Sequence, residues 1–234
     1  MRFAKAAAVV AGAALAFGAG AAVPASAGTQ IIGGTTVSSA PWGAQVFWDD
    51  VTDYGGFECS GTIIAPQWVL TAQHCLNKPG MHVKVGDVSL GKGTEAAVDQ
   101  QQASPNGDIA LLHLKSSVDT TYMKLADQDP ADGATNQIYG WGRTLNQSPP
   151  SDTLKTADVQ VTGSSTDAFD GKAIASKGVS GSSWHGDSGG PQLADGVQVG
   201  VCSTGENSGS DEHGTQNYAS VANSRDWIKQ TAGV

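Results

Sequence analysis

The feature of the sequence that most constrains the fold is a succession of short β-type runs separated by Gly, Asn, Asp and Pro. These runs are 45–48, 61–64, 68–71, 82–85, 109–114, 137–141, 154–161, 172–175, 197–202 and 218–221. No long helical periodicity lies between them, so they predict an all-β sandwich or barrel. A helix is expected only at the end of the chain, capped by Asn223 or Ser224 and running to about Thr231.

A polar stretch divides the chain near its middle. Residues 119–133 are rich in Asp and turn-forming residues, which indicates a connection between two halves. The 234 residues suffice for one domain of ordinary size or for two small lobes packed together.

The amino-terminal segment has the pattern of a secretory signal. Arg2 and Lys5 precede an apolar run over 6–22, and residues 24–27 then offer an A-x-A-like cleavage site. A membrane anchor is the alternative, but the run is short, rich in Ala and Gly, and followed by a cleavage signal. We therefore expect a removable signal over 1–27, a secreted protein, and no membrane association after cleavage, because no later stretch is apolar enough to span a bilayer.

The charge of the chain argues against a nucleic-acid partner. The formal net charge is -9, and loss of the two positive charges of Arg2 and Lys5 with the signal makes it -11. An acidic domain repels phosphate backbones, so acidity here favours solubility.

The three cysteines allow one disulfide at most. Cys59 and Cys75 flank an apolar stretch and could close a short loop, worth about 3 kcal/mol in the chain-entropy model. Cys202 lies in a strand-like run and is interpreted as a small buried hydrophobic residue.

No metal or cofactor is expected. The chain has no Cys/His spacing typical of a metal site. The aspartates of 48–53 could in principle hold calcium, but they lack the ligand spacing of an EF-hand loop, and a solvated acidic loop is the preferred interpretation.

Ser188 is the candidate nucleophile. It lies in Gly186-Asp187-Ser188-Gly189-Gly190-Pro191, where the small neighbours let a substrate carbonyl approach backbone N–H groups. A serine hydroxyl is a weak nucleophile alone, so it needs a general base, a group that orients the base, and donors for the developing oxyanion.

His74 and Asp108 are the candidates for the base and its orienting group. The apolar run 68–72 delivers His74 directly beside Cys75, where a disulfide would fix its position. Asp108 comes directly before the apolar run 109–112, which would bury its carboxylate. In the protein interior its electrostatic attraction to an imidazolium partner is strongest.

The three motifs together resemble the chymotrypsin family of serine endopeptidases, especially its secreted bacterial members. The segments that carry the resemblance are 31–34 (IIGG), 59–64 (CSGTII), 71–75 (TAQHC), 108–112 (DIALL), 140–142 (GWG), 186–191 (GDSGGP) and 218–230. Their order along the chain, with His before Asp before Ser, is typical of this family.

The resemblance implies two six-stranded antiparallel β-barrels followed by a C-terminal α-helix, with catalysis in the cleft between the barrels. In this interpretation His74 accepts the proton of Ser188, and Asp108 orients His74. The N–H groups of Gly186 and Ser188 form the oxyanion hole, and Ser203 supports Asp108. The barrels are expected over 31–125 and 126–220 and the helix over 221–234; Cys59 and Cys75 are expected to be disulfide-bonded.

The resemblance also implies activation by cleavage. Residues 28–30 would form a short propeptide, and the new ammonium of Ile31 would pair with Asp187 and shape the oxyanion hole. The residue before the cleavage point is Gln30, so activation by a trypsin-like enzyme is not expected.

The primary pocket is expected to be neutral. Ser182 stands where trypsin-like members have an aspartate. Ser203 and Gly205 belong to the wall of the pocket, and Gly205 matches the family glycine that leaves the pocket mouth open. A chymotrypsin- or elastase-like preference is predicted. A glutamyl preference is an alternative, with Ser183 and His213 as candidate ligands of the carboxylate.

Two other function classes are alternatives to a serine endopeptidase. An α/β-hydrolase esterase needs alternating strands and helices and the order Ser, Asp, His. The only histidine after Ser188 is His213, and Asp211 is too close to it in sequence to be a typical partner. A protease-like protein that only binds is the second alternative, although the chain retains all three candidate residues. The expected partners are protein or peptide substrates and protein inhibitors of proteases, and the expected state is a monomer.

Overall fold

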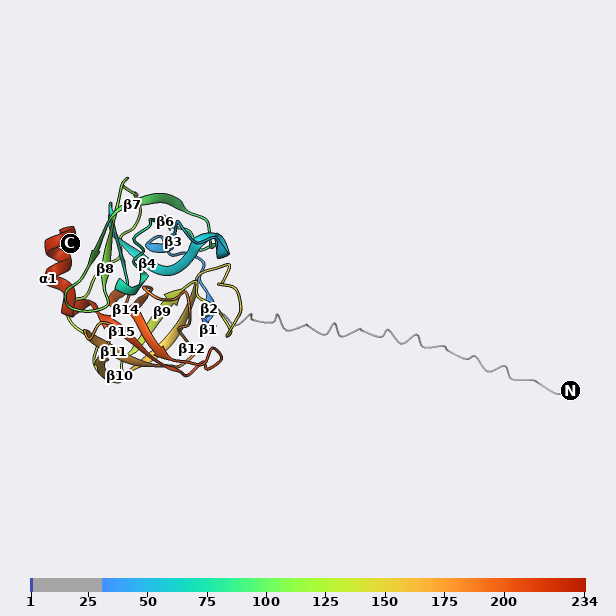
Figure 1. The fold of residues 1–234 in the computed structure, drawn as a ribbon. Helices are drawn as coiled ribbons and strands as arrows, with labels where there is room; N and C mark the ends of the chain where they lie inside the picture. Colours follow the sequence, from blue (N-terminus) through green and yellow to red (C-terminus); the bar gives the residue numbers. More distant parts are fainter. Residues whose placement is uncertain (2–30) are drawn as a thin grey trace.

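The computed structural model describes Met1 and residues 31–234, so the expected signal over 1–27 and propeptide over 28–30 lie outside the described residues, Met1 apart. The described chain forms two six-stranded antiparallel β-barrels and one C-terminal helix (Figure 1), which confirms the predicted fold class. No helix in residues 31–234 is long and apolar enough to cross a membrane.

The first barrel closes in the order β3-β4-β5-β8-β7-β6, with every neighbouring pair antiparallel. Its strands are β3 (Gly43–Trp48), β4 (Phe57–Ala65), β5 (Trp68–Thr71), β6 (Met81–Val85), β7 (Thr94–Ala103) and β8 (Ala110–Leu114). Burial alternates along β6, as expected for a strand with one face toward a barrel interior.

The second barrel has the order β11-β15-β14-β13-β9-β10, and pairing of β10 with β11 closes the ring. Its strands are β9 (Thr135–Gly140), β10 (Lys155–Thr166), β11 (Lys172–Gly178), β13 (Pro191–Ala194), β14 (Val197–Glu206) and β15 (Thr215–Ser220). Short strands attach the start of the chain to it: β1 (Ile32–Gly33) pairs with β12 (Gly181–Ser182), and β2 (Thr35–Thr36) pairs with β10.

Each of the ten predicted runs overlaps a strand of a barrel, but two strands of the barrels were not predicted. These are β7 and β13. Two short 3-10 segments, η1 (Asp53–Gly56) and η2 (Gln73–Cys75), lie in the first half.

The terminal helix α1 spans Val221–Ala232, and the predicted caps Asn223 and Ser224 are wrong. Ser220 is the N-cap, and its hydroxyl accepts a hydrogen bond from the N–H of Asn223 at 3.1 Å. Ser224 lies one turn inside the helix, is buried, and shares a hydrogen bond with the hydroxyl of Ser104 at 2.9 Å.

The largest hydrophobic core crosses from one barrel to the other. It joins first-barrel residues such as Ile63 and Leu112 with Val201 of the second barrel and Ile228 of α1, all at most 1% exposed. Because the apolar faces of the two barrels and the helix share this core, the surfaces that carry His74 and Ser188 are held against each other.

Candidate active site

His74 lies at the end of β5, in the 3-10 turn η2. The neighbouring Cys75 is disulfide-bonded to Cys59 of β4, with the two Cα atoms 6.2 Å apart. The disulfide and the turn hold the imidazole at the cleft, where the side chain is 31% exposed.

Asp108 precedes β8 and is fully buried directly behind His74. One carboxylate oxygen, Oδ1, accepts the backbone N–H of His74 at 2.9 Å, and Oδ2 lies 2.7 Å from Nδ1 of the same ring. The Ser203 hydroxyl donates a third hydrogen bond to Oδ2 at 2.6 Å. These contacts orient the His74 ring so that Nδ1 faces Asp108 and Nε2 has no contact with it.

The ionisation of Asp108 is governed by two opposing effects. Burial alone raises the pKa of the carboxyl, but the hydrogen bond and charge of His74, with the Ser203 hydroxyl, outweigh it and hold the pKa below its ordinary value. A carboxylate that stays ionised is suited to stabilise an imidazolium.

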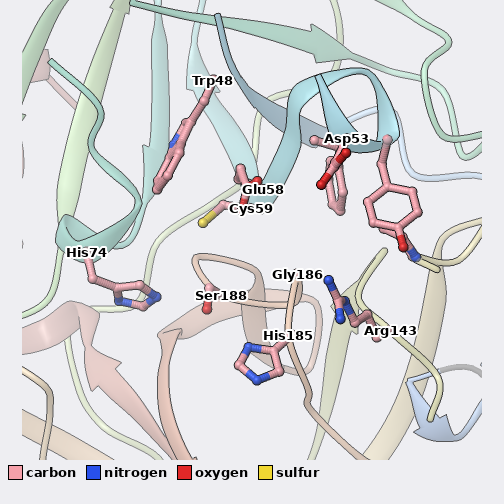
Figure 2. Close-up of a pocket in the computed structure, with 12 residues that line it drawn as sticks. Trp48, Asp53, Glu58, Cys59, His74, Arg143, His185, Gly186 and Ser188 are labelled. Carbon is pink, nitrogen blue, oxygen red and sulfur yellow. The ribbon is translucent and has the colours of Figure 1, made fainter. Parts of the chain in front are cut away.

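Ser188 lies in the turn before β13, on the second barrel, and is positioned from the first barrel by Ser60 of β4. The N–H of Ser60 donates to the carbonyl of Ser188 at 2.8 Å, and the Ser60 hydroxyl donates to the carbonyl of Gly186 at 2.9 Å. His74 and Ser188 line the same two cavities, of about 350 and 310 Å³. In Figure 2 the imidazole points toward Ser188; no hydrogen bond joins the two side chains in the described structure.

The backbone around Ser188 presents unused donors to the cleft. Gly186 has a φ of 96°, in the left-handed region that favours glycine. The N–H groups of Gly186 and Ser188 donate to no atom of the described residues, unlike the N–H groups of Gly189 and Gly190, which pair with backbone carbonyls. Two free donors beside a serine hydroxyl are the arrangement that an oxyanion requires.

Asp187 turns away from the cleft into the protein and is 1% exposed. Its carboxylate accepts the N–H of Gly142 at 2.8 Å and the N–H of Trp184 at 2.9 Å. A Cβ at Gly140 or Gly142 would lie 2.1 or 2.5 Å from carboxylate atoms of Asp187, so both glycines make room for it.

Burial raises the pKa of Asp187 to about 7, although its backbone hydrogen bonds lower it. No cationic side chain of the described residues pairs with this carboxylate. The side chain of Ile31, the expected partner after cleavage, is buried at 1% exposure in the core of the second barrel with Cys202 and Tyr218.

The cavity of about 310 Å³ lies where the primary pocket is expected. Ser203, Thr204 and Gly205 of β14 line one side of it, and Ser183 and Trp184 line another. No acidic or basic side chain except His74 and His185 lines this cavity.

Ser182 and His213 do not line that cavity. The hydroxyl of Ser182 donates to the carbonyl of Asp211 at 2.5 Å and accepts from Nδ2 of Asn207 at 2.6 Å. Nδ1 of His213 lies 3.0 Å from the carbonyl of Gly178, and the ring does not line the cavity that Ser183 lines.

Gln216 lies behind the walls of the cavity. It is opposite Gly205 in the register of β14 and β15, and its Oε1 accepts the N–H of Ser183 at 2.9 Å. Because this N–H can pair only with the amide oxygen, the orientation of the amide is fixed, and its Nε2 is buried with no partner among the described residues.

The larger cavity brings in residues that the sequence analysis missed. Trp48, Glu58 and Arg143 line it beyond Ser188 (Figure 2). Burial raises the pKa of Glu58, while the charge of Arg143 lowers it. These residues come from β3, from β4 and from the loop after β9, and they carry no local motif, so only the fold brings them together.

The described residues offer no metal site at the cleft. Cys59, His74 and Cys75 have ligand atoms within 4.8 Å of one another, but both sulfurs are used in the disulfide. Burial raises the pKa of Cys202 to about 12, so this free thiol stays protonated. In the acidic loop Asp49 pairs with His82, and Asp50 accepts a hydrogen bond from Asn77.

The comparison with protein families decides the identity of the chain. The family model described as Trypsin matches residues 31–228. The chain belongs to the trypsin family. It is a serine protease of this family and therefore a hydrolase.

Individual proteins of the trypsin family are also similar to this chain. Kallikrein-8 of Homo sapiens is 30% identical over 223 residues, which cover 83% of this chain and 83% of the relative. Trypsin iota of Drosophila melanogaster is 30% identical over 230 residues, covering 87% of this chain and 88% of the relative. Among solved structures, neuropsin, a serine protease expressed in the limbic system of mouse brain, is similar with a TM-score of 0.68 and 27% identity, covering 82% of this chain and 94% of that one.

Proposed function

We propose that this trypsin-family protein is a secreted endopeptidase that hydrolyses peptide bonds through Ser188, His74 and Asp108. The observation that carries the proposal is the hydrogen-bonded series from Ser203 through Asp108 to His74, which ends at a cavity also lined by Ser188. The natural substrates are proteins or peptides, protease inhibitors of protein nature are expected partners, and the enzyme acts as a monomer.

The reaction begins with attack of the Ser188 hydroxyl oxygen on the carbonyl carbon of the scissile bond. Nε2 of His74 accepts the hydroxyl proton, and the imidazolium is stabilised by the buried carboxylate of Asp108. The same proton passes to the leaving amine, and the acyl-enzyme remains. Water then attacks the acyl carbon with His74 as the base, which releases the acid product and restores Ser188.

The negative charge on the carbonyl oxygen is stabilised by the N–H groups of Gly186 and Ser188. Both donors are unused within the described residues, so they are available to donate hydrogen bonds to the oxyanion.

Maturation supplies the remaining part of the site. We place the signal over 1–27 and the propeptide over 28–30, so that cleavage after Gln30 frees the ammonium of Ile31. That ammonium would pair with Asp187, a fully buried carboxylate whose pKa of about 7 reflects the lack of such a partner.

The bacterial origin suggested by the leader and the motifs is part of the same proposal, whereas the relatives named above are animal proteins.

The preferred substrate side chain is apolar rather than basic. The primary cavity has no carboxylate to bind Arg or Lys, and Gln216 occupies the space behind its walls. An elastase- or chymotrypsin-like preference follows, and the glutamyl alternative loses support because His213 lies outside the cavity.

Hydrolysis of labelled casein by the wild type and by Ser188→Ala tests the proposed function. We expect Ser188→Ala to lower kcat by about 10⁶-fold, by analogy with loss of the subtilisin nucleophile. The exposed Ser164→Ala, on β10 of the second barrel, is the control and should keep wild-type activity. Equal hydrolysis by wild type and Ser188→Ala would instead support a protein that only binds, with any activity due to a contaminant.

A further inference from the structure

A second buried aspartate, Asp167, lies close to the candidate triad. It begins the loop that joins β10 to β11 in the second barrel and is 7% exposed. Its Oδ1 accepts the N–H groups of Phe169 and Gly171, both at 2.9 Å. These two hydrogen bonds hold the loop closed and use only one of the two carboxylate oxygens.

The other carboxylate oxygen of Asp167 accepts a hydrogen bond from the first barrel. Oδ2 accepts the backbone N–H of Asp108 at 2.8 Å, and Asp108 lies 59 positions earlier in the chain. A Cβ at Gly107 or Gly171 would lie 2.3 or 2.6 Å from this oxygen. The absence of a side chain at these two glycines therefore leaves room for the carboxylate. Closure of the loop does not need this bond, because Oδ1 already provides it.

The same loop also orients the hydroxyl that supports Asp108. The N–H of Ala168 donates to the hydroxyl oxygen of Ser203 at 3.0 Å, while that hydroxyl lies 2.6 Å from Oδ2 of Asp108. A hydroxyl has one hydrogen, and Ala168 supplies rather than accepts one, so the Ser203 hydrogen is directed at Asp108.

We propose that Asp167 is a positioning residue for peptide hydrolysis, acting through Asp108. The loop fixes the backbone of Asp108 through the hydrogen bond to Asp167. It also directs the Ser203 hydroxyl toward the Asp108 carboxylate through the N–H of Ala168. Together these contacts set the direction of Oδ2 toward Nδ1 of His74, 2.7 Å away. This inference rests on the proposed function, since it assigns Asp167 a part in the same reaction.

Asp167→Asn separates the two tasks of the carboxylate. An asparagine keeps both loop hydrogen bonds by placing its Oδ1 toward Phe169 and Gly171, which leaves its Nδ2, a donor, facing the N–H of Asp108. The loop therefore stays closed while the contact to Asp108 becomes repulsive.

Asp170→Asn is the matched control. Asp170 lies in the same loop, is exposed, and makes no side-chain contact with Asp108, yet the substitution removes the same charge. Its φ of 60° is one that asparagine adopts readily.

The experiment measures kcat and KM on labelled casein, with active sites counted from the end-point of fluorophosphonate labelling. Per active site, we expect Asp167→Asn to lower kcat 10- to 100-fold, as outer-shell substitutions commonly do, with KM changed less than about twofold. Asp170→Asn should match the wild type. Equal kcat for the two variants would overturn the proposal.

A double-mutant cycle distinguishes positioning from general support of the fold. In an Asp108→Ala background the carboxylate to be positioned is gone, so Asp167→Asn should change the rate of fluorophosphonate labelling less than about twofold. The same fold-loss in both backgrounds would overturn the proposal. Failure of the proposed function has a separate signature, which is wild-type activity in Ser188→Ala.

Discussion

Ser203 shares its hydroxyl between two partners, accepting from Ala168 and donating to Asp108. In Ser203→Ala the carboxylate loses one of its donors inside the protein. A hydrogen bond to a charged group contributes about 1.5–3 kcal/mol, so we expect kcat on labelled casein to fall about 10- to 100-fold with KM nearly unchanged. Ser164→Ala should match the wild type; a kcat for Ser203→Ala within twofold of the wild type would contradict this role.

Asp187 should make the stability of the uncleaved chain depend on pH. Its pKa is about 7 in the folded chain and 3.8 when unperturbed, so the native state keeps a proton that the unfolded state loses. Stability therefore falls as pH rises from about 4 to about 7. One pKa unit corresponds to about 1.4 kcal/mol, which makes the full loss on the order of 4 kcal/mol.

Urea unfolding of the uncleaved Ser188→Ala chain at several pH values measures this dependence. Adding Asp187→Asn removes the titrating group and should flatten the curve between pH 4 and 7. The same pH dependence with and without Asp187→Asn would show that other groups cause it.

Residues that carry local signals could be predicted from the sequence. The apolar runs after Asp108 and before His74 indicated a buried acid and a fixed base, and the structure places these side chains 2.7 Å apart. The contact between Asp167 and Asp108 had no such signal, because the pair is 59 positions apart and Asp167 stands in an ordinary turn sequence.

At the level of elements, the disulfide anchors the turn that carries His74. It joins β4 to η2 across a separation of 16 residues. The chain-entropy model gives about 3 kcal/mol for a loop of this size. We expect a Cys59→Ala, Cys75→Ala double variant to lose about that much unfolding free energy in urea, whereas Cys202→Ala leaves the disulfide intact and serves as its control. A loss below about 1 kcal/mol would contradict the estimate.

The two barrel strands β7 and β13 were not predicted for different reasons. β7 is exposed and polar along much of its length, so it lacks the alternation by which strands are predicted, and its conformation follows from pairing with β6 and β8. β13 is only four residues long and begins with a proline. The helix cap was misplaced by three or four residues because Asn223 and Ser224 are good caps in sequence, while β15 delivers Ser220 to the helix start.

At the scale of the whole molecule, the site depends on two barrels whose strand pairings include strands distant in sequence. β3 pairs with β6 in the first barrel, and β9 pairs with β13 in the second. The run pattern predicted a sandwich or barrel, and the two-barrel arrangement was predicted from the resemblance. The shared core, which includes Val201 and Ile228, then brings His74 and Ser188 to one cleft.

Mass spectrometry after reaction with a fluorophosphonate tests the central claim most directly. The reagent forms a covalent bond only with a serine that has been activated as a nucleophile, so the site of the adduct identifies that serine. We predict one adduct per chain, on the peptide that contains Ser188, and a strong loss of labelling in His74→Ala. An adduct on another serine, or labelling of Ser188 at the same rate without His74, would contradict the account.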